Sequence, residues 1–177
     1  MKKHVLFLTG LFAALAVLTV LAGRERRGSS ASRLLAGVSL PALGGVDRKD
    51  MGACSTHRCL NVYVSPWCGV CRASTGLVKD LRGYLSEKGV ETRVIVGRDS
   101  PGEVEGYAQE FGPGTFLDPG GRFPLRGGVP NFIVSDAEGR ILRSVPGVPR
   151  VYHSPVSPEI LQSFAESLEL FEAPARS

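Results

Sequence analysis

The sequence lacks a strong excess of charge of either sign and is poor in aromatic side chains. Its 177 residues carry a formal net charge of +4, the basic residues are scattered, and Phe, Trp and Tyr together make up 7% of the chain. A nucleic-acid-binding domain needs Lys and Arg clustered on one face. The sequence therefore shows no nucleic-acid footprint. It also has no internal repeat, and its length suits one domain with a real core plus extensions.

Only one long apolar run is present, and it lies near the N-terminus. Residues 5–22 carry no charge, follow Lys2 and Lys3, and precede a group of arginines that begins at Arg24. A positively charged start, an apolar run and a small-residue cleavage site are typical of a secretory signal peptide. The run also has the length of a membrane span, which takes about 17 to 25 residues. We expect residues 1–23 to be either a signal peptide or a transmembrane anchor.

No cysteine follows Leu21-Ala22-Gly23, and this excludes the lipoprotein type of signal. The flanking charges argue for a cytoplasmic C-terminal side, because the arginines after the run outnumber the lysines before it. The signal-like layout argues for export, as do two cysteines, Cys54 and Cys59, that make sense as a disulfide only in an oxidising compartment. We expect export to a periplasm-like space, with residues 5–22 as a candidate inner-membrane anchor.

The next segment, residues 24–53, is rich in Gly, Ser and Ala and has one short apolar patch between Leu34 and Leu43 that Pro41 interrupts. Such a composition is typical of a linker, with at most a weak helix or an edge strand. We therefore expect a linker over residues 24–53 and a folded domain over residues 54–173.

Within this domain, strand and helix patterns alternate. We expect a strand over 60–65, a helix from the cysteine pair to Lys88, a strand over 92–96, a helix over 101–111, strands over 131–135 and 140–145, and a helix that begins at Pro158. The helices follow from apolar residues three and four apart, and the strands from short β-branched runs. Residues 112–128 are dense in Gly and Pro, so we expect no regular structure there beyond a hairpin near 118–121. The order β-α-β-α-β-β-α predicts an α/β sandwich.

Two cysteines stand where the first strand gives way to the first helix. Cys68 follows Pro66 and Trp67, and Cys71 comes three residues later. A thiol reacts as its thiolate, which the backbone N–H groups at a helix N-terminus stabilise. Cys71 lies one turn further on the same face and is close enough to attack a mixed disulfide held on Cys68. This spacing indicates a redox-active dithiol, with Cys68 as the nucleophile and Cys71 as the resolving residue.

At this point the chain resembles the thioredoxin superfamily, over roughly Leu60 to Phe171. Its Trp-Cys-x-x-Cys site is matched by residues 67–71, and its cis-proline loop by Gly128-Val129-Pro130. The resemblance implies a thioredoxin-like three-layer sandwich and a protein-disulfide oxidoreductase without a dissociable cofactor. It implies that Trp67, Val129 and Pro130 frame the substrate, a protein with thiols or disulfides. An extended peptide would bind to the backbone of Val129 by strand addition.

The chain departs from thioredoxins proper at two positions. Val62 stands where they carry a buried carboxylate, and Val70 stands where they carry Pro between the cysteines. The Gly-Val dipeptide leaves the redox direction open. Residues 129–134 resemble membrane-tethered reductases of the cytochrome-maturation type. Reduction of exported proteins is therefore the preferred direction, with a membrane protein as the electron donor, and oxidation or isomerisation stays open.

The second cysteine pair, Cys54 and Cys59, lies at the other end of the strand that leads to Cys68. That strand is about 20 Å long at ~3.3 Å per residue, so the two pairs cannot meet. This argues against a four-cysteine zinc site, whose ligands lie about 2.3 Å from one metal ion. We interpret Cys54 and Cys59 as a local structural disulfide in preference to free thiols or metal ligands, and assign no metal site.

Two other functions stay open. The first is a copper-binding assembly factor on a thioredoxin-like fold, with Cys68, Cys71 and His153 as ligands that would have to share one small coordination sphere. The second is a redox-inert interaction domain, which requires Cys68 to be buried with an ordinary thiol pKa.

Overall fold

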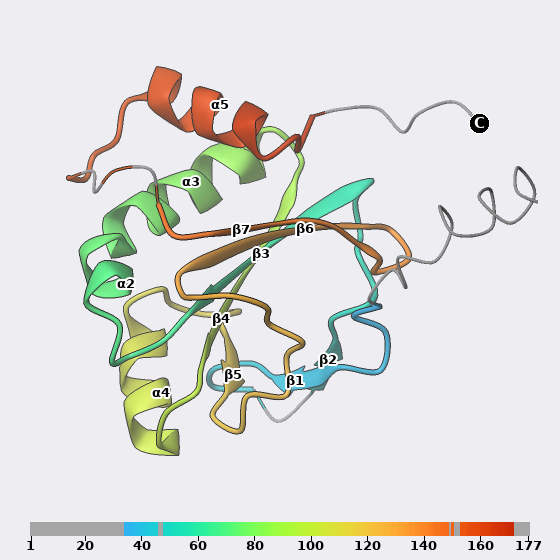
Figure 1. Ribbon diagram of the computed structural model, residues 1–177, viewed down its shortest axis with the longest axis vertical. Coiled ribbons are helices and arrows are strands. Elements are labelled where there is room, and N and C mark those ends of the chain that lie inside the picture. Colours follow the sequence, from blue (N-terminus) through green and yellow to red (C-terminus); the bar gives the residue numbers. More distant parts are fainter. Residues whose placement is uncertain (1–33, 46–47, 149, 151–152, 172–177) are drawn as a thin grey trace, which may run out of the picture. The chain divides into compact units, whose positions relative to one another are not determined.

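The computed structural model describes residues 34–45, 48–148, 150 and 153–171 (Figure 1). The expected signal peptide or anchor, residues 1–23, lies outside the described residues. Within the described ranges, no helix has both the length and the apolar character needed to cross a membrane.

The core of the fold is a five-stranded mixed sheet with the strand order β5-β4-β3-β6-β7. Its strands are β3 (Arg58–Val64), β4 (Glu91–Gly97), β5 (Phe116–Asp118), β6 (Asn131–Asp136) and β7 (Ile141–Pro146). The first three are parallel to one another, and β6 pairs antiparallel with both β3 and β7. β3 is central and almost wholly buried, as its apolar sequence requires.

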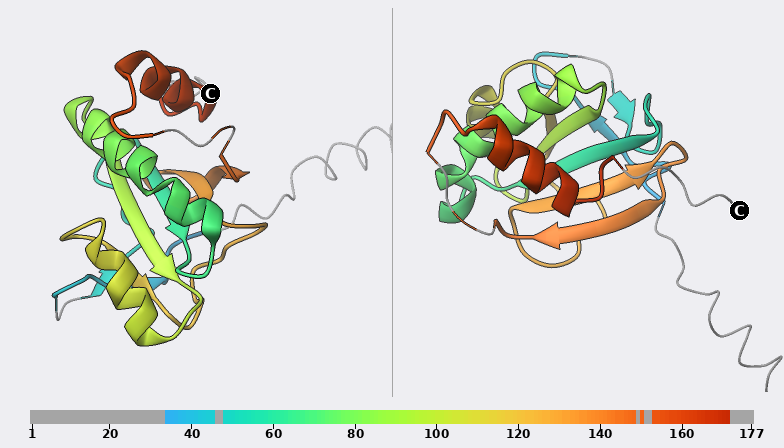
Figure 2. Two further views of the ribbon diagram at one scale, coloured as in Figure 1. Left: turned by 90° about the vertical axis from the view of Figure 1, so that its left-hand side faces the viewer. Right: turned by 90° about the horizontal axis from the view of Figure 1, so that it is seen from above.

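The helices lie on one face of this sheet. They are α2 (Gly69–Ala73), α3 (Thr75–Glu87), α4 (Pro101–Gln109) and α5 (Pro158–Ser167). The two parallel crossovers, β3 to β4 and β4 to β5, step in the same direction along the sheet. Because such crossovers are right-handed, α3 and α4 must lie on the same side, as Figure 2 shows. Their buried side chains and those of α5 form one hydrophobic core with the sheet.

The opposite face of the sheet is covered without a helix. A second hydrophobic cluster forms there from Leu35, Leu40 and Met51 together with side chains of the sheet and Phe123. Two short antiparallel strands, β1 (Ser39–Pro41) and β2 (Arg48–Asp50), belong to this layer. The described residues 34–45 and 48–53 thus belong to the compact unit, which begins at Arg33, where we expected a linker. The short apolar patch in this segment was the visible sign of this packing.

The expected order of strands and helices from β3 to α5 is confirmed. Two details differ. The helix after the cysteines is interrupted at Ser74, which separates α2 from α3. The Gly- and Pro-rich segment contains the edge strand β5, where we expected no strand. Three residues are too few to give a periodic pattern, and parallel pairing with β4 is a tertiary effect that local sequence does not show.

Arg93 and Glu91 hold the second layer against the edge of β4. The Arg93 side chain is buried, and its guanidinium donates to Glu91 at 2.7 Å and to the carbonyl of Met51 at 2.8 Å. Glu91 also accepts from Lys49 at 2.8 Å and from the backbone N–H of Ser55 at 2.8 Å. Burial raises the pKa of the Glu91 carboxyl, but these hydrogen bonds outweigh it and hold the pKa well below its usual range.

We expect Glu91→Gln to lower the free energy of unfolding at pH 7. The free energy of unfolding of this variant should also fall less between pH 7 and acid pH than that of the wild type. A carboxyl whose pKa is depressed by folding stabilises the native state above its unfolded pKa of about 4.3 and loses this contribution as the pH falls further. Urea unfolding at pH 7 and at several acid pH values measures both effects. The control is Glu105→Gln, at an exposed position of α4. An acid dependence equal in wild type and Glu91→Gln would contradict this role.

Candidate functional site

Cys68 and Cys71 lie where β3 meets α2. After Val64 the chain turns, and the N–H of Cys68 donates to the carbonyl of Ser65 at 3.1 Å. Cys68 is the N-cap of α2, and its Sγ accepts from the N–H of Cys71 at 3.1 Å. The two residues are joined in a disulfide with their Cα atoms 5.2 Å apart. Cys68 is 7% exposed and Cys71 0%, so Cys68 is the more accessible residue of the pair.

The segment before β6 reaches the same place. The Sγ of Cys68 lies 3.4 Å from the carbonyl oxygen of Val129, 61 residues away in the chain. In the disulfide form, the Cys68 sulfur carries no hydrogen and only contacts the Val129 carbonyl oxygen. In the reduced form, the Cys68 thiol can donate a hydrogen bond to that oxygen. The Val129–Pro130 peptide bond is cis. The structure thus brings Cys68, Cys71, Val129 and Pro130 together.

Trp67 forms an exposed apolar wall beside the cysteines. Its side chain is 64% exposed, yet its indole N–H donates to the carbonyl of Arg98 at 2.9 Å. Val70, between the two cysteines, is also exposed. An exposed aromatic ring held in place by one hydrogen bond offers contact area at little cost in side-chain entropy.

Arg72, on α2, stabilises the turn that precedes Cys68. This role was not predicted from the sequence. Its Nε donates to the carbonyl of Pro66 at 2.7 Å, and its guanidinium lies 4.8 Å from the ring centre of Tyr107. The same group lies 3.6 Å from the carboxylate of Glu110. These contacts join the cysteine turn to α4. No motif marks an arginine after Cys-x-x-Cys, so this contact could not be predicted from the sequence.

A buried polar pair lies behind the same turn. The hydroxyl of Tyr63, on β3, donates to the carboxylate of Asp118 at 2.9 Å, and both side chains are almost fully buried. Gly97 passes directly over this pair. A Cβ at Gly97 would lie 2.2 Å from the Tyr63 hydroxyl oxygen and 2.4 Å from the Asp118 carbonyl oxygen. Only glycine therefore fits at the end of β4.

The second cysteine pair lies at the other end of β3. Cys54 and Cys59 are joined in a disulfide with Cα atoms 5.9 Å apart, and the Sγ of Cys59 is 3.5 Å from a carboxylate oxygen of Glu91. β3 has seven residues and is about 23 Å long at ~3.3 Å per residue, so the two disulfides are well separated.

Among the residues that the structure describes, only Cys54, Cys59 and Glu91 bring three potential metal ligands within 4.8 Å of one another. Both sulfurs are in the disulfide, and the carboxylate is already bonded to Lys49 and Arg93. Cys68 and Cys71 do not form such a group with His153, which is exposed. The arrangement therefore offers no support for a three-ligand copper site at these residues.

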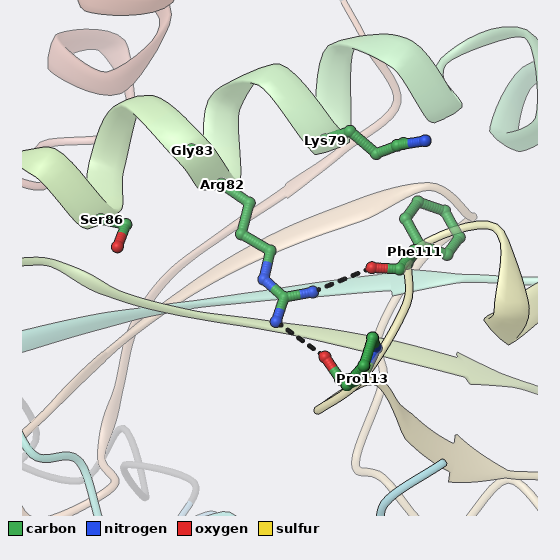
Figure 3. Close-up of a pocket in the computed structure, with 6 residues that line it drawn as sticks. All are labelled: Lys79, Arg82, Gly83, Ser86, Phe111 and Pro113. Carbon is green, nitrogen blue, oxygen red and sulfur yellow. Dashed lines mark hydrogen bonds between the residues drawn. The ribbon is translucent and has the colours of Figure 1, made fainter. Parts of the chain in front are cut away.

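A surface pocket of about 400 Å³ lies elsewhere, between α3 and the chain after α4 (Figure 3). The Arg82 guanidinium donates to the carbonyls of Phe111 and Pro113 at 3.2 and 3.1 Å. Figure 3 shows Arg82 pointing from α3 toward both carbonyls. None of the residues that line this pocket is a cysteine. Arg82 anchors the segment that leads into β5, and the pocket is separate from the site at Cys68.

Comparison with known proteins identifies the fold. No protein-family model and no curated protein matches the chain. Solved structures do match. A secreted disulfide oxidoreductase of Mycobacterium tuberculosis, homologous to E. coli DsbE, has a TM-score of 0.53 at 15% identity, with 73% of this chain and 95% of that chain covered.

Two further matches are similar. The thioredoxin domain of a Bacteroides vulgatus thiol-disulfide oxidoreductase gives a TM-score of 0.53 at 13% identity, with 77% and 96% of the two chains covered. The exposed lipoprotein thioredoxin of Streptococcus pneumoniae gives 0.51 at 19% identity, with 72% and 97% covered. The described part of the chain therefore has the thioredoxin fold, in agreement with the resemblance seen in the sequence.

We expect Gly97→Ala to destabilise the protein by about 1 to 3 kcal/mol, the usual cost of forcing an extra carbon into a filled site. The matched control is Gly106→Ala in α4, where a Cβ meets nothing within 4 Å. Because alanine favours helix, that change should stabilise the protein by up to about 1 kcal/mol. Urea unfolding of both variants gives the comparison. Equal stabilities of Gly97→Ala and wild type would show that the space above Tyr63 is not filled.

Proposed function

We propose that the protein is a thiol-disulfide oxidoreductase that exchanges disulfides with other proteins through Cys68 and Cys71. The observation that carries this proposal is the position of the Cys68 sulfur. It caps α2, it belongs to the more exposed residue of the pair, and it lies 3.4 Å from the carbonyl oxygen before the cis proline. The fold and the exposed Trp67 beside the pair support the same function.

In the reducing direction, the thiolate of Cys68 attacks one sulfur of a substrate disulfide. That bond breaks, a mixed disulfide forms on Cys68, and the other substrate sulfur leaves as a thiolate. Cys71 then attacks the Cys68 sulfur, closes the Cys68–Cys71 disulfide and releases the second substrate thiolate. Two electrons pass from the pair to the substrate, and the same steps run backward in the oxidising direction.

The surroundings of Cys68 suit its role as attacking and leaving group. A hydrogen bond from the Cys71 N–H to the Cys68 sulfur is stronger for the thiolate than for the thiol, because charge on the acceptor strengthens it. Val62 supplies no carboxylate on β3, so water or another group carries the protons to and from Cys71. No dissociable cofactor takes part in these steps.

The substrate is a protein segment with a thiol or disulfide, bound in an extended conformation between Trp67 and Val129-Pro130. The backbone of Val129 precedes β6 and can pair with such a segment by strand addition, which needs no particular side chain. The exposed Trp67 and Val70 would contact apolar residues of that segment.

Reduction of exported proteins is the proposed direction, in a periplasm-like space, with a membrane protein as the electron donor. Residues 1–23 would serve as the signal peptide or membrane anchor. The similarity in fold to a secreted disulfide oxidoreductase and to an exposed lipoprotein thioredoxin supports export. The chain from residue 33 onward would then form the exported domain, including most of the expected linker.

We expect Cys71→Ser to accumulate mixed disulfides with protein substrates, because the residue that resolves them is gone. Cys68→Ser should form none, since it lacks the attacking sulfur. Trapping with an alkylating reagent, followed by non-reducing gels, distinguishes the two variants. The control is the Cys54→Ser/Cys59→Ser double variant, which should exchange as wild type does. Mixed disulfides on Cys71 in the Cys68→Ser protein would reverse the assignment.

We expect Cys68–Cys71 to open at a higher redox potential than Cys54–Cys59. A nearby backbone N–H stabilises the thiolate at Cys68, whereas burial and the Glu91 carboxylate destabilise one at Cys59. Thiol trapping in graded glutathione and dithiothreitol buffers measures both couples. Opening of Cys54–Cys59 first would contradict the assignment of roles.

The same titration gives the direction of the reaction. A Cys68–Cys71 potential near or below the thioredoxin value of about −270 mV supports a reductase. A value near the DsbA potential of about −120 mV supports an oxidant or isomerase instead.

A further inference from the structure

The buried pair behind the active site connects three segments of the chain. Asp118 accepts the Tyr63 hydroxyl at 2.9 Å, and its two carboxylate oxygens also accept the backbone N–H groups of Arg122 at 2.7 Å and Phe123 at 3.0 Å. These two residues lie in the first half of the segment 119–130, which runs from β5 to β6 and contains Val129 and Pro130 (Figure 1). One end of the substrate-binding segment is thus fixed to Tyr63 through Asp118.

Asp118 is also connected to Trp67, on the other side of the site, through Arg98. The N–H of Arg98 donates to the Asp118 carbonyl at 3.1 Å, and the Arg98 carbonyl accepts the indole N–H of Trp67 at 2.9 Å. Arg98 has a φ of 59°, a left-handed conformation that non-glycine residues seldom adopt. Its guanidinium lies 5.9 Å from the ring centre of Tyr63, on which the ring of Phe123 also packs.

The segment 119–130 is also fixed at its far end. The side-chain amide of Asn131 donates to the carbonyl of Arg126 at 2.8 Å, and its oxygen accepts the Ser144 hydroxyl at 2.9 Å. Asp118 and Asn131, both buried, therefore hold the two ends of a segment that has no helix or strand of its own. The hydrogen bonds of Asp118 and Asn131 therefore determine the position of the Val129 backbone, to which a peptide would bind.

We propose that the Tyr63–Asp118 hydrogen bond positions both substrate-contacting walls, Trp67 through Arg98 and Val129-Pro130 through the segment 119–130. Tyr63 and Asp118 are positioning residues and do not touch the reacting sulfurs. This inference rests on the proposed exchange reaction at Cys68. Burial, reinforced by the charge of Asp118, raises the pKa of the Tyr63 hydroxyl, so this group stays protonated and continues to donate at any pH the protein meets.

The test is Tyr63→Phe, which removes the hydroxyl and keeps the ring. Trp67 is the only tryptophan of the chain, so its fluorescence reports directly on one wall of the site. We expect stronger quenching of Trp67 by acrylamide, because the indole is held less firmly. For reduction of a synthetic cyclic disulfide peptide, the KM should rise about fivefold, which corresponds to one hydrogen bond worth about 1 kcal/mol, and kcat should change little.

Two further variants complete the design. Asp118→Asn keeps the volume but replaces one of the two accepting oxygens with an NH2 donor, and it should move quenching and KM in the same direction. Tyr84→Phe is the matched control, since Tyr84 lies on α3 and is not part of this network. It should leave quenching and KM at the wild-type values.

The outcomes separate this inference from the proposed function. If Tyr63→Phe lowers the melting temperature but leaves Trp67 quenching and the peptide KM unchanged, the hydrogen bond is merely structural and the inference is overturned. Oxidised wild-type protein is also treated with dithiothreitol, a small dithiol that needs no extended binding site. If Cys68–Cys71 does not open, the proposed function fails, and the inference about substrate positioning fails with it. If the pair opens and the peptide reacts, the KM decides the inference alone.

Discussion

The antiparallel pairing of β3 with β6 is the constraint on which the site depends. Tyr63 pairs with Asn131, so the last residues of β3 and the first residues of β6 meet at one edge of the sheet. The chain leaves β3 toward Cys68 at this edge and enters β6 from Pro130 at the same edge. Cys68 and Val129, 61 residues apart in the chain, are thereby brought to 3.4 Å from one another. The ladder of backbone hydrogen bonds supplies the precision that the chemistry needs.

The direction of the crossovers from β3 to β4 and from β4 to β5 explains why the second face of the sheet is covered by segments without a helix. With α3, α4 and α5 gathered in one hydrophobic core, the second face of the sheet needs another cover. Residues 34–53 and the segment 119–130 provide it, and between them they bury Leu35, Met51 and Phe123. Because these segments have little regular structure, side-chain hydrogen bonds fix them instead. Arg93 binds carbonyls of the first segment, and Asp118 binds N–H groups of the second.

Much of this arrangement could be predicted from the sequence, because local signals carry it. Alternating β-branched runs and helical stripes gave the order from β3 to α5, and the spacing of Cys68 and Cys71 marked the candidate site. What could not be predicted depends on contacts between distant residues. The pairing of β5 and the Tyr63–Asp118 hydrogen bond leave no periodic pattern in the sequence, and the apolar patch between Leu34 and Leu43 does not show what it packs against. A tyrosine in a buried strand looks like an ordinary core residue until its partner is known.

The packing of residues 34–53 also limits how far the protein could reach from a membrane. If residues 5–22 are retained as an anchor, the chain between that anchor and the compact unit has only the ten residues 23–32. At about 3.6 Å per residue, this length of chain spans at most about 36 Å, whereas a linker that continued to residue 53 would have allowed about three times as much. An anchored protein would therefore work close to the bilayer surface.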